Sequence, residues 1–93
     1  MAKVSRTNGF ASRLRDALVT DLAQTDIKAK VETELVRGTR LHRVWVIAPK
    51  FARLRPRERQ DLVWRIVDRH FNPDDQLRIS MIFTVTPSEL PDE

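Results

Sequence analysis

The side chains with the clearest chemical potential in this sequence are basic residues gathered in one short stretch. Within ten positions the chain holds Lys50, Arg53, Arg55, Arg57 and Arg59. One acidic residue interrupts them, so the stretch carries a net charge of +4, equal to the formal net charge of the whole chain. Guanidinium groups pair their N–H donors with phosphate oxygens, so the stretch is predicted to contact DNA or RNA. The alternative is a solvated basic loop without a ligand.

The basic stretch ends where a helix is expected to begin. Pro56 is typical of the first turn of a helix. Arg55 and Arg57 would then lie at the positive end of the helix dipole, where carboxylates are preferred. We expect this cluster to repel itself and to be stabilised by a bound anion, because a helix N-terminus also presents free N–H donors.

The remaining residues offer little that could catalyse a reaction. The absence of cysteine removes disulfides, thiol catalysis and thiolate metal sites. His42 and His70 have no metal-site spacing, and His42 is at most a single weak ligand. Gly9 and Gly38 do not open a phosphate-binding loop. The chain is therefore predicted to be no enzyme and to carry no cofactor or metal.

Length and composition favour one small domain. The 93 residues are 41% hydrophobic, and the pI near 10.3 favours an acidic partner such as nucleic acid. No apolar run approaches the roughly 20 residues of a membrane span. We expect a flexible N-terminus over 1–8, a domain over 9–90 and an acidic tail over 91–93. The simplest localisation is cytoplasmic, with no membrane contact.

Hydrophobic periodicity predicts the elements in order. Helical spacing covers 9–23, with Asn8 as a possible cap, and again Pro56 to His70. Alternation predicts a strand over 27–35, followed by a turn at Gly38 and a strand over 41–48. A helical piece is possible over 51–54. A loop is expected over 74–76, then a strand over 77–86 and a single helical turn after Thr86.

This order predicts an α+β fold in a single two-layer domain. The order is α-β-β-α-(α)-β, with the optional helix at 51–54. About 30 residues separate the second and third strands, which requires a crossover rather than a hairpin. The expected sheet is three-stranded, mixed or antiparallel, with the helices on one face.

The second strand carries apolar side chains on both faces. Trp45 and Ile47 alternate with Val44 and Val46. Trp45 and Ile47 either pack in a core covered on both sides or form an exposed docking patch. Core packing is the preferred interpretation.

Three segments, taken together, resemble the BolA family. Val44-Trp45-Val46-Ile47-Ala48-Pro49-Lys50-Phe51 is similar to the family's strand and following Phe. Arg59-Gln60-Asp61-Leu62-Val63-Trp64 falls at its helix motif, and Thr84-Val85-Thr86-Pro87-Ser88-Glu89-Leu90 is similar to its ending. The resemblance covers most of the chain after about Asn8, and it implies the BolA fold.

The family's characteristic histidines are replaced in this chain. The helix-motif His is Gln60 and the Arg after it is Asp61, while the His that opens the last strand is Arg78. A further His matches Leu41, with His42 one place away. In the family these histidines are tied to iron–sulfur cluster sharing with monothiol glutaredoxins. The resemblance therefore implies the fold, but the imidazoles for that cluster role are missing.

The BolA fold is itself similar to the class II KH fold, whose Gly-x-x-Gly loop holds nucleic-acid backbone. The matching stretch, Ala52 to Arg57, has neither glycine. Two hypotheses follow. The first is a nucleic-acid-binding or regulatory domain that uses the basic stretch. The second is a BolA-type adaptor that docks a protein, such as a monothiol glutaredoxin, through Trp45, Gln60 and Arg78.

Overall fold

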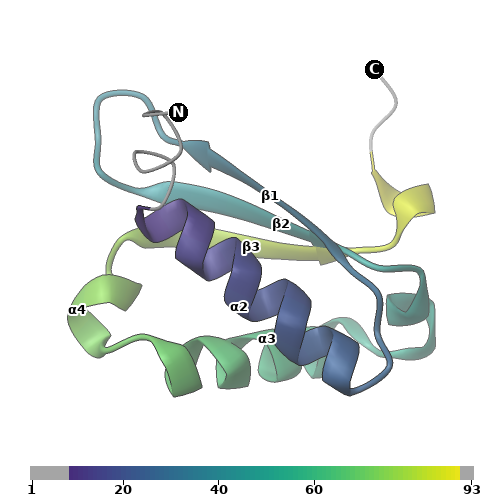
Figure 1. The fold of residues 1–93 in the computed structure, drawn as a ribbon. Helices are drawn as coiled ribbons and strands as arrows, with labels where there is room; N and C mark the ends of the chain where they lie inside the picture. Colours follow the sequence, from purple (N-terminus) through teal and green to yellow (C-terminus); the bar gives the residue numbers. More distant parts are fainter. Residues whose placement is uncertain (1–8, 91–93) are drawn as a thin grey trace, which may run out of the picture.

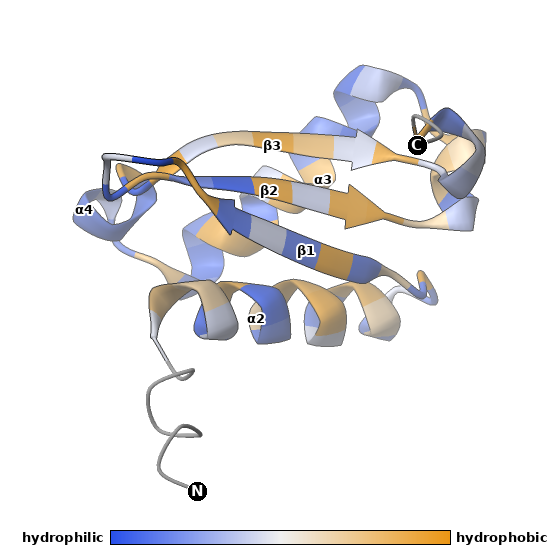
Figure 2. Ribbon diagram, turned by 90° about the horizontal axis from the view of Figure 1, so that it is seen from above, coloured by the Kyte–Doolittle hydropathy of each residue, from blue (hydrophilic) through white to orange (hydrophobic). Residues whose placement is uncertain are grey.

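Two helices pack against one face of a three-stranded sheet, and the other face is open (Figures 1 and 2). The computed structural model describes residues 9–90, so the expected 1–8 segment, the Asn8 cap and the 91–93 tail lie outside the described part. The elements are α2 (Phe10–Gln24), β1 (Lys30–Leu35), β2 (His42–Ile47), the 3-10 helix η1 (Pro49–Arg53), α3 (Pro56–His70), α4 (Pro73–Gln76), β3 (Ile79–Val85) and the 3-10 helix η2 (Pro87–Glu89). The predicted α+β class is confirmed.

The sheet is mixed, in the order β1-β2-β3. β1 and β2 form an antiparallel hairpin, whose turn contains Gly38 at φ +79°, as predicted. β2 and β3 are parallel, because the chain returns through α3 to the end of the sheet where β2 began. The connection from η1 to α3 therefore lies at the end of the sheet where β2 and β3 finish (Figure 1).

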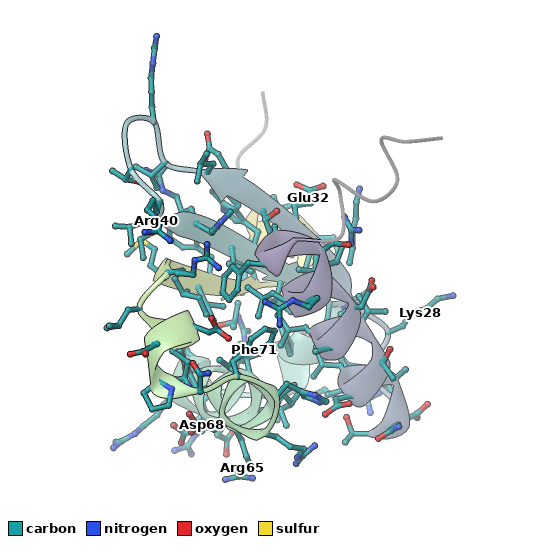
Figure 3. The ribbon with its side chains drawn as sticks, turned by 60° about the vertical axis from the view of Figure 1, so that its left-hand side comes forward. Lys28, Glu32, Arg40, Arg65, Asp68 and Phe71 are labelled. Atoms are coloured by element: carbon teal, nitrogen blue, oxygen red, sulfur yellow. The ribbon has the colours of Figure 1, made fainter. Side chains whose placement is uncertain are left out.

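The core lies between the sheet and the two long helices. The inward strand face contributes Val31, Val44, Val46 and Ile82, which are neighbours in the strand register. The helical stripes contribute Leu14, Leu18 and Leu22 from α2, and Val63, Ile66 and Val67 from α3. Figure 3 shows Phe71 directed into this layer, whereas Arg65 and Asp68 point to solvent.

The first strand is shorter than its alternation predicts. Lys30 is the first paired residue because its partner, Ile47, is the last residue of β2. Ile27 remains buried as part of the chain that leads from α2 into the sheet. Leu35, predicted to face the core, is 56% exposed at the hairpin end of the edge strand. The alternation of apolar and polar residues thus identified the inward face of β1 but not the residue at which β1 begins to pair with β2.

The segment after α3 is helical rather than the expected loop. Pro73 ends α3, as predicted, but it also occupies the first turn of α4. The side chain of Asn72 accepts a 2.8 Å hydrogen bond from the backbone N–H of Asp75 and so caps that turn. α3 itself has the predicted bounds. The turn expected after Thr86 is η2, where Glu89 accepts from the Thr86 N–H at 2.9 Å.

Candidate nucleic-acid interface

The basic stretch forms the connection from η1 to α3, which we call the basic junction (Lys50, Arg53, Arg55 and Arg57). All four side chains belong to exposed residues. Phe51 lies among them with no exposed surface and anchors η1 to the core. The backbone N–H of Leu54 donates to the carbonyl of Phe51 at 3.0 Å and closes the short helix. The junction is thus an exposed charged surface on an anchored support.

Lys50 already has a carboxylate partner. Its Nζ lies 2.6 Å from Oδ2 of Asp26, which follows α2. This hydrogen bond is the main cause that lowers the pKa of the Asp26 carboxyl, with the charge of Lys50 acting in the same sense. Asp26 holds φ at +65°, a left-handed conformation that Asp tolerates better than most residues. A phosphate at Lys50 would therefore compete with Asp26.

The three arginines of the junction have no carboxylate partner in the part of the chain that the structure describes. Glu58 is nearby, but its Oε1 accepts from the backbone N–H of Arg55 at 2.8 Å. That is one half of a capping box; the other half requires an acceptor on the Arg55 side chain, and guanidinium has none. Glu58 places a negative charge in the first turn of α3. Glu58 therefore offsets part of the repulsion between the arginines and the positive end of the α3 dipole.

Arg59 is not part of this surface. It is only 7% exposed, and its guanidinium turns inward beneath η2. Nε donates to the carbonyl of Leu54 at 3.1 Å, Nη1 donates to the carbonyl of Thr84 at 3.1 Å, and Glu89 accepts two further bonds. The sequence-based assignment of Arg59 to a phosphate contact needs correction. Its donors are used by the nearby carbonyl of Leu54 and by Thr84 and Glu89, which lie 25 and 30 positions later in the chain.

Trp45 lies on the open face of the sheet. Its ring stacks on that of Phe83, the neighbouring residue in the parallel register, at 5.2 Å and 20°. Both residues are half-buried, so Trp45 belongs neither to the helix-covered core nor to a fully exposed patch. Ile47 and Val85 form the next row on the same face. Phe83 was missed from sequence, since only the strand register reveals its pairing with Trp45.

A hollow of about 450 Å³ continues this apolar strip at the end of the sheet near η2. Its apolar lining is Ala29, Ile47, Pro49, Pro87 and Leu90, and its charged lining is Lys28, Lys30 and Glu32. Lys30 pairs with Glu32 at 3.3 Å. In Figure 3 the side chain of Lys28 extends away from the protein. The open face therefore combines an apolar strip with a charged edge strand.

The other two residues of the predicted interaction surface lie elsewhere. The Gln60 amide donates to the carbonyl of Ile82 at 2.8 Å and to Thr84 Oγ1 at 3.2 Å, and its oxygen accepts from Trp64 Nε1 at 3.1 Å. Gln60 thus ties α3 to β3 and has its bonds within the protein. Arg78 lies at the opposite end of the sheet, before β3. Trp45, Gln60 and Arg78 are not brought together.

The residues around His42 do not fit an iron–sulfur cluster. The imidazole packs on the ring of Phe10 at a centroid distance of 5.4 Å. Burial lowers the pKa of His42, and the charge of Arg78 lowers it further. A guanidinium offers no lone pair to a metal. Within residues 9–90, no three His, Cys, Asp or Glu side chains gather in a way that could hold a metal ion.

The order α-β-β-α-α-β on a mixed three-stranded sheet defines a BolA-like fold. The solved structure of BolA1 from Arabidopsis thaliana matches with a TM-score of 0.64 at 23% sequence identity, over 90% of this chain and 99% of that one. At this identity the likeness establishes the fold. Neither a protein-family model nor a curated protein matches the sequence. Over the described residues, none of the helices has the length and apolar character needed to cross a membrane.

Proposed function

We propose that this protein is a non-enzymatic domain that binds the backbone of DNA or RNA through the basic junction. The observation that carries this proposal is the trio Arg53, Arg55 and Arg57. They are exposed, they have no ion-pair partner among the described residues, and they follow one another at alternate positions on an anchored connection. Lys50 adds a fourth cation next to them.

The mode of contact would be side chain to phosphate. The stretch has no glycine at which a phosphate could approach the backbone closely, and Glu58 occupies the N–H at the start of α3. Contacts to phosphate position a protein without reading bases. Binding should therefore be weakly sequence-selective and should weaken steeply with salt, because each contact releases counterions from the nucleic acid.

The experiment is fluorescence anisotropy with single- and double-stranded DNA and RNA over a series of salt concentrations. A variant with Arg53→Gln, Arg55→Gln and Arg57→Gln should reduce the salt slope by about one per lost phosphate contact. The matched control replaces Arg37, Arg40 and Arg65, all exposed and outside the junction, by Gln. The control removes the same charge and should lose much less affinity.

Two results would defeat this proposal. An equal loss of affinity in both triple variants would show that binding depends only on the net charge of the protein. The absence of binding to every probe at low salt would leave the junction as a solvated surface. Circular dichroism of both variants shows whether the fold is retained, which is expected because the replaced side chains are exposed.

A second candidate function, a protein adaptor, is supported by the open sheet face. The stacked Trp45 and Phe83 have Val85 and the buried Ile47 beside them. They lie on the sheet face that none of the described helices covers (Figure 2). Gel filtration with a monothiol glutaredoxin under cluster-reconstitution conditions tests the partner. We expect no coloured, stable complex, since the ligand histidines are missing. A coloured complex that His42→Ala abolishes would favour the adaptor function instead.

A further inference from the structure

A separate positively charged pocket lies where α2 begins. Figure 1 shows that this end of α2 and the connection from η1 to α3 lie at opposite ends of the protein. Its volume is about 380 Å³, within the range of small-ligand sites. The lining residues are Gly9, Phe10, Ala11, Ser12, Arg15, His42 and Arg78, and we call this cavity the α2 pocket. Its lining contains two arginines and no carboxylate. The pocket is therefore electropositive by composition.

Arg78 is the first unusual group of the α2 pocket. Its guanidinium carbon lies 5.2 Å from the centre of the Phe10 ring, so the ring supports one face of the cation. Its Nε is buried and has no hydrogen-bond partner among residues 9–90. It forms no ion pair within residues 9–90, although Asp74 and Asp75 line the neighbouring hollow with it. A buried donor without a partner lowers the stability of the fold unless a bound group accepts its hydrogen bond.

Arg15 is the second cation, and its bonds are weak. Its Nη2 lies 3.3 Å from Ser12 Oγ, and its Nε lies 3.9 Å from the exposed carboxylate of Asp16. Surface ion pairs at that distance contribute little. The Arg15 side chain is half exposed at the rim of the pocket. It can therefore turn donors toward a ligand with little loss.

The first turn of α2 supplies backbone donors to the same pocket. The first backbone bond in the helix runs from the Arg13 N–H to the Gly9 carbonyl at 3.1 Å, and the preceding residues line the pocket. Gly9 has no side chain to cap these N–H groups, and the first turn holds no acidic residue. The positive end of a 15-residue helix thus adds to the two guanidinium groups.

We propose that the α2 pocket binds a phosphate group, as free phosphate or as a small phosphate monoester. Arg78 and Arg15 would pair with its oxygens, and the first N–H groups of α2 would complete the contacts. This site is independent of the basic junction. The BolA resemblance implies a metal-binding histidine at the position of Arg78. An imidazole favours a metal, whereas the guanidinium of Arg78 favours an oxyanion.

The charged groups around His42 make it a reporter of the bound anion. Arg78 faces it from the segment before β3, and Arg15 lines the same pocket from α2. Burial, and then the charge of Arg78, keep the pKa of His42 low in the free protein. A phosphate beside Arg78 would offset that charge and raise the His42 pKa.

The test is an NMR titration with inorganic phosphate at constant ionic strength, balanced with chloride. We expect saturable shifts of the Ala11 and Ser12 amides and a rise in the His42 pKa. Arg78→Gln and Arg15→Gln should each weaken binding by about tenfold, the effect of losing one charge-assisted hydrogen bond. The control is Arg65→Gln on the exposed face of α3 (Figure 3), which should bind as the parent does.

Several outcomes would overturn this inference. Shifts that do not saturate, or that chloride alone reproduces, would show only ionic screening. Equal weakening by Arg65→Gln would show a dependence on net charge. Because Arg78 is partly buried, Arg15→Gln provides the test if Arg78→Gln fails to fold. Saturable binding to an oligonucleotide but not to inorganic phosphate or to a phosphate monoester would also contradict the proposal.

Discussion

Arg59 of α3 holds Glu89 of η2 through two hydrogen bonds, 2.9 Å from Nη1 to Oε1 and 3.4 Å from Nη2 to Oε2. The same guanidinium donates to the carbonyl groups of Leu54 and Thr84. It also lies 5.8 Å from the ring centre of Phe51, which anchors the basic junction. One side chain therefore connects η1, α3, β3 and η2 at the end of the sheet that carries the proposed nucleic-acid interface.

Replacing Arg59 by Met should lower the free energy of unfolding by about 1.5–3 kcal/mol, the usual range for hydrogen bonds to a charged group. The physical reason is that two carbonyl acceptors lose their donor, that of Thr84 in a buried place and that of Leu54 in a partly buried one. Urea denaturation measures the change. Arg57→Met is the control, because Arg57 is exposed and should stay within about 0.5 kcal/mol of the parent. Similar losses in both variants would argue against a structural role for Arg59.

The structure separates two core residues that the sequence placed in one stripe. Ile66 is 3% exposed, whereas Leu62 is only half-buried at the edge of the core. Ile66→Ala should therefore cost about 2–5 kcal/mol, and Leu62→Ala clearly less. Thermal or chemical denaturation of both variants checks this order. A larger loss in Leu62→Ala would mean that the buried face of α3 is rotated from its assigned position.

Asp21 links the two long helices and should make stability depend on pH. Its Oδ2 lies 2.9 Å from His70 Nε2 and 2.8 Å from Arg69 Nη1. The bond to His70 is the main cause that lowers the pKa of Asp21 below its ordinary 3.8; burial opposes this and Arg69 supports it. The stabilisation is complete above the ordinary pKa and is lost as the pH falls through the lowered pKa of the folded state.

The corresponding variant is Asp21→Asn. It should lose about 1–3 kcal/mol at neutral pH, since a buried charged acceptor is removed, and it should show a shallower fall in stability at acid pH. Urea unfolding from neutral pH to below 3.8 measures both effects. Asp16→Asn on the exposed side of α2 is the control and should retain the parent's profile. An unchanged acid limb in Asp21→Asn would refute the link.

Asp26 should restrain nucleic-acid binding, a prediction that rests on the proposed function. Asp26→Asn removes the carboxylate that competes for Lys50 while keeping a residue that tolerates φ near +65°. Affinity should rise roughly two- to fivefold at low salt, the scale of a surface ion pair. Asp68→Asn, which also removes one exposed negative charge, is the control (Figure 3). An equal gain in both would show that only net charge matters.

From the amino-acid sequence alone, the order of the strands and the two long helices, most of the inward face of each helix and the hairpin turn could be predicted. These features follow from local chemistry: the apolar stripe ending at Val67, the alternation before Leu35, the positive φ of Gly38 and the stop at Pro73. Each depends on neighbours within a few residues. The sequence did not predict the strand boundaries, because a strand begins only where its partner strand can pair with it.

Which charged and aromatic groups meet depends on how the elements pack in three dimensions. In the sequence Arg59 is one more residue of a basic stretch. In the folded protein its guanidinium donates to Glu89, 30 positions later in the chain. Trp45 acquires its stacking partner from the parallel register with Phe83. The α2 pocket joins Arg15 to Arg78 from opposite ends of the chain. Hydrogen bonds and ion pairs act over a few ångströms in space, whereas sequence patterns report only what lies close along the chain.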